Sequence, residues 1–227
     1  MRSHVVISGT GRAGTSFLVE LMTCLGLDTG FSADSLQSKK DRYARAGLET
    51  DIRDDNAPYI VKSPHFCDYV GEVISRGDVS IEHVFVPIRD LNAAAESRRF
   101  VDELAVSNLP LYKQIKNKIV KRKIVGGLWQ TANGHEQEEV LLHKVYQLLL
   151  GLSNSGIPVT LINYPRLVRD PIYTYEKLKP VLRDLSFSAF DKSFSYIAKP
   201  CLVHQFNERD KWEFQRAYPS VGAATAL

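Results

Sequence analysis

The chain has 227 residues, of which 29 are basic and 26 acidic, giving a formal net charge of +3. Hydrophobic residues make up 44% and charged residues 24%. This composition excludes a disordered chain, and the near balance of charges excludes a polycation that coats nucleic acid. At roughly 150 residues per domain, we expect one elaborated domain rather than two.

The cysteines and the apolar segments bear on where the protein works. Cys24, Cys67 and Cys201 are an odd count without a CxxC pair, which indicates reduced thiols in a cytosol and no zinc site. No apolar run approaches the roughly 18 residues of a membrane helix. No signal peptide precedes the first expected strand. We therefore expect a cytoplasmic protein without an integral membrane segment.

Strand and helix patterns alternate along the chain. Short apolar, β-branched runs predict strands over residues 4–8, 59–62, 81–88 and 158–163. Helical periodicity predicts helices over residues 15–25, 66–76, 91–104, 136–153, 171–182 and 187–197. Strands separated by helices imply an α/β fold with a doubly wound parallel β-sheet, in which ligands bind beyond the carboxyl ends of the strands. We expect a single domain over residues 1–227 with a basic helical insertion around 105–134.

One glycine-rich segment lies between the first expected strand and helix, and it reads Gly9-Thr10-Gly11-Arg12-Ala13-Gly14-Thr15-Ser16. Its outer glycines have the spacing of a P-loop, GxxxxGK[ST], whose backbone N–H groups and helix N-terminus bind phosphate. Thr15 stands where an NTPase has its lysine, and Arg12 supplies a cation inside the loop instead. The missing lysine argues against ordinary ATP or GTP hydrolysis.

This loop, followed by an apolar helix, resembles the 5′-phosphosulfate loop of sulfotransferases that use 3′-phosphoadenosine 5′-phosphosulfate (PAPS). An arginine at the place of Arg12 is similar to the bacterial and tyrosylprotein branches of that family. The resemblance covers roughly residues 4–104 and 157–185. It implies a P-loop nucleotide-binding fold, PAPS as co-substrate and no required metal. It assigns PAPS binding in the loop to Gly11, Arg12, Ala13, Gly14, Thr15 and Ser16.

The family also has a site for the 3′-phosphate, formed by an arginine at a later strand end and a serine eight residues on. Arg89 and Ser97 have that spacing, and a forked guanidinium and a hydroxyl can reach one phosphate. Tyr164 resembles a tyrosine on the adenine side of the family's site, although a core or turn tyrosine is the alternative. Arg209, with Lys211, lies where the family commonly has a late basic loop that closes over the 3′-phosphate.

Sulfuryl transfer requires residues that hold the sulfonate, neutralise the leaving oxygen and remove the acceptor proton. Arg12 and Lys62 fit the first two, and the family often has a lysine at the place of Lys62. His65 is a candidate general base because a histidine near pKa 6.5 accepts a proton at neutral pH. Asp34, 22 residues after Arg12, is the rival base, and Glu49 is a weaker candidate.

The implied acceptor is a hydroxyl of a small molecule, a glycan or a lipid. Basic residues gather over 113–123, either as a solvated helix face or as a lid that attracts an anionic acceptor. The scarcity of aromatic residues there argues against nucleic-acid binding. Two other functions stay open: a P-loop nucleotide or small-molecule kinase, and a nucleotide-binding relative without catalysis.

Overall fold

A computed structural model shows an α/β fold built on four parallel strands. It describes residues 1–41, 46–107, 124, 126–131 and 133–203. The strands are β1 (Arg2–Ile7), β2 (Ile60–Lys62), β3 (Val79–Ile88) and β4 (Val159–Asn163), in the spatial order β2-β1-β3-β4. Every neighbouring pair is parallel. The expected parallel sheet is therefore confirmed, and all four carboxyl ends meet at one edge.

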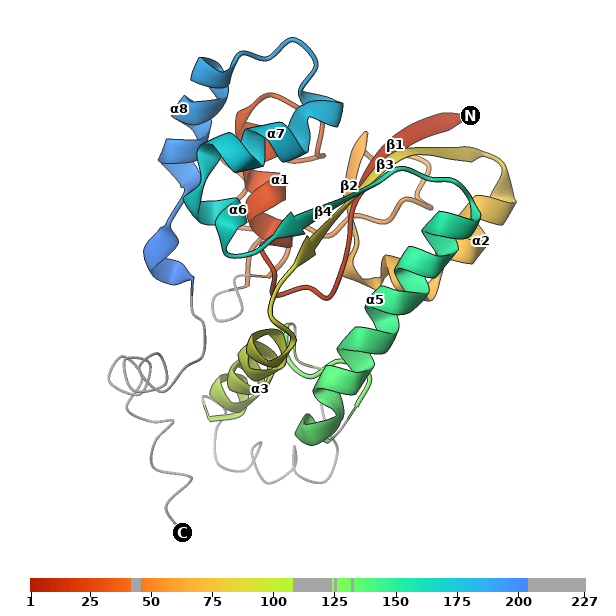
Figure 1. Ribbon diagram of the computed structural model, residues 1–227, viewed down its shortest axis with the longest axis vertical. Helices are drawn as coiled ribbons and strands as arrows, with labels where there is room; N and C mark the ends of the chain where they lie inside the picture. The colour runs from red at the N-terminus through yellow and green to blue at the C-terminus, as the bar shows by residue number, and fades with distance from the viewer. Residues whose placement is uncertain (42–45, 108–123, 125, 132, 204–227) are drawn as a thin grey trace.

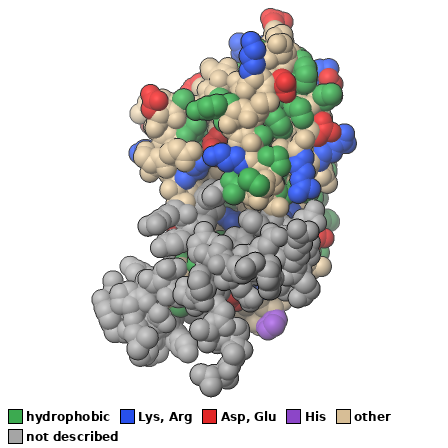
Figure 2. All heavy atoms as spheres, turned by 90° about the vertical axis from the view of Figure 1, so that its left-hand side faces the viewer, with side chains coloured by type: hydrophobic (Ala, Val, Ile, Leu, Met, Phe, Trp, Pro, Cys, Tyr) green, Lys and Arg blue, Asp and Glu red, His purple; other side chains and the backbone are tan. Residues whose placement is uncertain are grey.

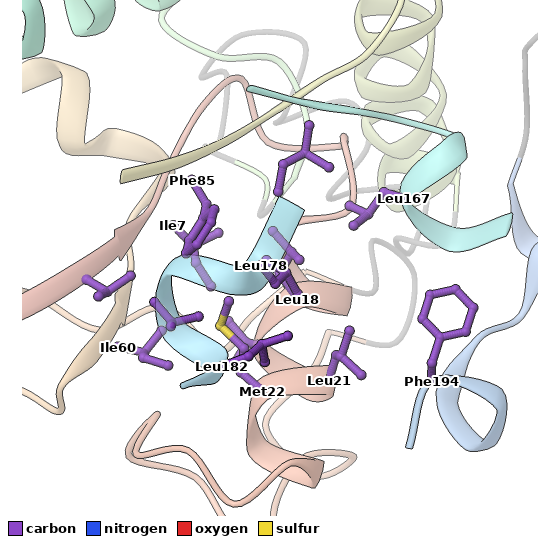
Figure 3. Packing of buried hydrophobic residues seen from close by; sticks show 14 of the residues in the cluster. Ile7, Leu18, Leu21, Met22, Ile60, Phe85, Leu167, Leu178, Leu182 and Phe194 are labelled. Atoms are coloured by element: carbon purple, nitrogen blue, oxygen red, sulfur yellow. The ribbon is translucent and has the colours of Figure 1, made fainter. Parts of the chain in front are cut away.

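One face of the sheet is covered by α1 (Thr15–Cys24), α7 (Pro171–Leu182) and α8 (Phe187–Ile197), as Figure 1 shows. Apolar residues of β1 and β3 pack against the buried stripe of α1, where Leu18, Leu21 and Met22 are fully buried. Figure 3 shows Leu178 of α7 beside Leu18, so the first and the late helices share one core. This core fixes the start of α1, and with it the end of the glycine-rich segment.

The opposite face of the sheet is covered by α2 (Val70–Arg76), α3 (Leu91–Ser107) and α5 (Gln137–Asn154) (Figure 1). Their apolar residues form a second core with Val6, Val84 and Val86 of the strands. β-strand side chains alternate between the two faces, so each central strand contributes to both cores. Helices thus cover both faces, as the predicted doubly wound arrangement requires.

Most expected elements are confirmed, and α7 and α8 keep their expected bounds. The single helix expected over 66–76 is wrong. A 3-10 helix, η1 (Pro64–Asp68), comes first, and α2 starts only at Val70. Proline fits the first position of a helix, so Pro64 starts η1 early. Tyr69 interrupts the helix with a non-helical φ of −139°, and its hydroxyl donates to Ser63 Oγ at 2.8 Å.

Among the described residues, three short elements were not expected from the sequence: η2 (Gly134–Glu136), α6 (Arg166–Arg169) and η3 (Pro200–Leu202). The whole basic run 113–123 and all of 204–227 lie outside the described residues. No helix in the described ranges combines the length and the apolar character needed to cross a membrane. Figure 2 shows basic and acidic side chains interspersed over the described part of one face, in keeping with the small net charge.

Candidate anion-binding site at the strand ends

The segment from Gly9 to Ser16, called the glycine loop below, curls between the end of β1 and the start of α1. Gly11 and Gly14 have positive φ angles of 63° and 88°, which favour glycine. Both are also tightly packed. A Cβ on Gly11 would lie 2.9 Å from an Nη of Arg98, and one on Gly14 would lie 2.9 Å from the Tyr164 ring. These two glycines are therefore required by backbone conformation and by space.

Arg12 is the point at which several predicted residues meet. It adopts a left-handed φ of 56°, which is uncommon for a residue with a Cβ and marks local strain. Its Nε donates to Ser97 Oγ at 3.0 Å. Arg89, at the end of β3, donates from Nη1 to the Arg12 carbonyl at 2.9 Å. The structure thus brings Arg12, Arg89 and Ser97 together, although their assigned phosphates stay a prediction.

Tyr164 belongs to the same group of residues. It follows β4 directly, its ring covers Gly14, and the Arg89 guanidinium lies 5.2 Å from the ring centroid. Burial raises the pKa of the Tyr164 hydroxyl, while the positive charges of Arg89 and Arg12 oppose that rise. Tyr164 therefore packs against the glycine loop, and the adenine-side role that the resemblance implies stays a prediction.

Lys62 is the most deeply buried cation of the site. It ends β2 beside Ile7 of β1 and is only 2% exposed. Its Nζ donates to Ser16 Oγ at 3.0 Å, to Glu49 Oε1 at 2.8 Å and to the Gly47 carbonyl. Burial lowers the pKa of Lys62, whereas the Glu49 carboxylate opposes that change. Lys62 therefore contacts the glycine loop through Ser16, and its assigned role in the reaction stays a prediction.

Glu49, which the sequence offered only as the weaker carboxylate candidate for the base, contacts Lys62 directly. The Glu49 side chain is 43% exposed, so its carboxylate touches a buried cation and solvent at once. Residues 28–56 lack periodicity, and the path that returns Glu49 to the sheet edge depends on tertiary contacts such as the Thr50 N–H donating to the Lys62 carbonyl. Spacing from Arg12 could not have indicated this arrangement.

The other two base candidates lie elsewhere. His65 sits on η1 with its Nδ1 3.7 Å from Asp68 Oδ2 and its ring edge-to-face with Trp129 at 5.0 Å. Lys62 Nζ contacts Ser16, Glu49 and Gly47 instead. Asp34 is exposed in a turn. Within the described part of the chain, no hydrogen bond or ion pair joins Asp34 to the glycine loop.

Arg98 is a cation at this site that the sequence interpretation missed. It is 7% exposed, and it donates to the Thr10 carbonyl and, at 2.7 Å, to the Gly127 carbonyl. Its guanidinium also lies 5.2 Å from the Trp129 ring centroid. Helical spacing could have found it, because Arg98 follows the buried Ala94 by four residues and precedes the buried Val101 by three.

Asp90 is the acidic residue next to Arg89 at the end of β3, where a kinase would need a ligand for its magnesium ion. It accepts the Ala93 N–H at 2.8 Å and so caps the start of α3. Arg209 lies outside the described residues, as does Lys211. Over the ranges that the structure describes, no group of three or more His, Cys, Asp or Glu side chains is placed to hold a metal ion.

No protein-family model matches the chain, and no curated protein matches it. The chemistry of the site therefore rests on its own residues. Four cations, Arg12, Lys62, Arg89 and Arg98, gather around one glycine loop at the carboxyl edge of a parallel sheet. A glycine-rich loop at a helix N-terminus with four nearby cations has the chemistry of a site for a multiply charged anion.

Proposed function

We propose that the protein is a sulfotransferase that moves a sulfuryl group from PAPS to a hydroxyl of a small-molecule, glycan or lipid acceptor. The observation that carries this proposal is the convergence of Arg12, Arg89 and Ser97 beside the glycine loop. PAPS carries one phosphate on its 3′ oxygen and a phosphosulfate on its 5′ oxygen. Arg12 in the loop is hydrogen-bonded to both Arg89 and Ser97. This arrangement suits a ligand with two nearby anionic groups.

The roles of the loop and of Lys62 follow from their positions. The loop N–H groups and the Arg12 guanidinium would hold the 5′ phosphosulfate. Lys62 Nζ, which lies at Ser16 at the start of α1, would place positive charge at the oxygen that leaves with the adenosine bisphosphate. In the reaction the acceptor oxygen forms a bond to sulfur while the sulfur–oxygen bond to the bisphosphate breaks. Fixed cations stabilise the negative charge that develops on that leaving oxygen.

The geometry favours Glu49 over His65 and Asp34 as the group that takes the acceptor proton. Glu49 contacts Lys62, and its partly exposed carboxylate can meet a hydroxyl that arrives from solvent. A general base must come within hydrogen-bond reach of the proton that it removes. His65 packs against Trp129 instead. The base assignment is part of this proposal, and separate variants of Glu49, His65 and Asp34 test it.

A kinase is the second candidate function, because the glycine loop has the spacing of a phosphate-binding loop. Against it, Thr15 stands in place of the loop lysine and Asp90 is engaged as a helix cap. Kinases of the P-loop class need a magnesium ion between the phosphates. A transferred sulfuryl group carries less charge than a phosphoryl group, so cationic side chains can serve in place of that ion.

Calorimetric titration separates these functions. We expect adenosine 3′,5′-bisphosphate to bind in the presence of EDTA, and ATP to bind weakly with or without magnesium. Magnesium-dependent ATP binding that exceeds the affinity for the bisphosphate would overturn the proposal in favour of a kinase. Release of the bisphosphate from PAPS with pooled sugar, lipid and phenol acceptors is the second measurement. Binding without any turnover would instead identify a nucleotide-binding relative without catalysis.

A further inference from the structure

Two arginines from other segments donate hydrogen bonds to carbonyl groups of the glycine loop. Arg98, on α3, donates to the Thr10 carbonyl, and Arg89 donates to the Arg12 carbonyl. In a trans peptide the carbonyl of one residue and the N–H of the next point in opposite directions within one plane. A cation fixed on the Thr10 carbonyl therefore fixes the direction of the Gly11 N–H.

Arg98 is also unusual in its own surroundings. Burial, and secondarily the charge of Arg12, lower the pKa of Arg98 to about 9. Its Nε is buried without a hydrogen-bond partner, and none of the described carboxylates is paired with it. A buried cation without a counter-ion is unfavourable. A purely structural arginine would be expected to pair with an acid, as the neighbouring Arg99 does with Glu138.

We propose that Arg98 is a positioning residue of the glycine loop: it holds the Thr10 carbonyl outward, so that the Gly11 N–H is aimed at the bound anion. Its second hydrogen bond, to the Gly127 carbonyl at 2.7 Å, ties the loop to the segment that carries Trp129. The buried charge of Arg98 is compensated when the loop holds an anion. This inference rests on the proposed function only in requiring that the loop binds an anion.

The test compares Arg98→Met and Arg98→Lys with the wild type, and Arg99→Met serves as the control on the adjacent residue. Inorganic pyrophosphate and adenosine 3′,5′-bisphosphate are titrated calorimetrically, and urea unfolding without added anion measures stability. We expect Arg98→Met to weaken both affinities about tenfold or more without loss of stability, because an apolar side chain replaces an uncompensated charge. Arg98→Lys keeps the positive charge but loses the forked guanidinium that reaches two carbonyl groups. It should weaken the two affinities less than Arg98→Met does.

The amide proton of Gly11 gives a readout that a merely structural role would leave unchanged. We expect its NMR resonance to move downfield when wild-type protein binds pyrophosphate, and to move much less in Arg98→Lys. Unchanged affinities and an unchanged Gly11 shift in Arg98→Lys would overturn the inference, even if Arg98→Met failed to fold. Failure of the wild type to bind either anion would overturn the proposed function itself, so the two failures are distinguishable.

Discussion

Arg12 Nε donates to Ser97 Oγ at 3.0 Å, across 85 residues of sequence. The contact joins the glycine loop to α3, the two segments that the proposed function places at different phosphates of one nucleotide. A serine hydroxyl that accepts a hydrogen bond keeps its own proton for a second acceptor. Ser97 can therefore serve Arg12 and a phosphate oxygen at once, and the two anion subsites are expected to be neighbours that share Arg12.

The first prediction concerns recognition of the 3′-phosphate. Arg89→Ala should weaken adenosine 3′,5′-bisphosphate binding about ten- to a hundredfold, since a charged hydrogen bond contributes roughly 1.5–3 kcal/mol. Affinity for adenosine 5′-phosphate should fall less. It should still fall to some extent, because Arg89 also donates to the Arg12 carbonyl. Titration calorimetry measures both. Arg76→Ala, which removes a cation paired with Asp78 away from the loop, is the control, and equal losses for the two nucleotides would contradict this role of Arg89.

The sequence predicted the meeting of Arg12, Arg89 and Lys62 for a physical reason. Each lies in or next to a strand of a parallel sheet, and the carboxyl ends of such strands share one edge. Local patterns therefore sufficed to bring residues from distant segments to one place. The same reasoning covers Tyr164, which follows β4 directly.

The rest of the site depends on tertiary packing that no local pattern encodes. Glu49 reaches Lys62 through a segment without periodicity. Pro64 starts a 3-10 helix, and His65 consequently packs on Trp129 rather than beside Lys62. Arg98 occupies a buried helical position that ordinarily holds an apolar side chain. Its polar partners, the Thr10 and Gly127 carbonyls, belong to other segments.

The second prediction is a pH dependence set by Lys62. Burial lowers the pKa of Lys62 and Arg12 lowers it further, while Glu49 and Glu20 raise it. Glu49→Gln removes one of the groups that raise this pKa, so the Lys62 charge should be lost at a lower pH. Affinity for adenosine 3′,5′-bisphosphate needs that charge, and its decline with rising pH should therefore begin earlier in Glu49→Gln. Calorimetry over about pH 6 to 10 measures the shift.

Glu20→Gln is the matched control for this pH shift. Glu20 acts on Lys62 through charge alone and is itself paired with Lys40 at 3.0 Å. Its replacement should move the decline in affinity less than Glu49→Gln does. A decline at the same pH in Glu49→Gln and wild type would show that Glu49 does not sustain the charge of Lys62.

The third prediction identifies the general base. Glu49→Gln should lower kcat for sulfuryl transfer about 10²- to 10⁴-fold, measured at a pH at which Lys62 is still charged. Asp34→Ala and His65→Ala should keep kcat close to the wild-type value. The side chains that accept hydrogen bonds from Lys62 Nζ are Ser16 and Glu49, not Asp34 or His65. A large loss in His65→Ala alone would return the assignment to the histidine. Similar kcat values for all three variants would show that none of them is the base.

The last prediction separates backbone strain from close packing in the glycine loop. Gly14 and Gly26 both have positive φ angles, 88° and 78°, so an alanine at either should cost about 1–2 kcal/mol in backbone energy. A Cβ on Gly26 would meet nothing within 4 Å, whereas one on Gly14 would lie 2.9 Å from Tyr164 and 3.0 Å from Leu167. Gly14→Ala should therefore lower the free energy of unfolding by about 1–3 kcal/mol more than Gly26→Ala.

Gly14→Ala should also weaken anion binding, because the first N–H groups of α1 follow Gly14. Urea unfolding and pyrophosphate titration test both effects. Equal stability losses in the two variants would show that the Tyr164 ring yields freely and does not fix the loop.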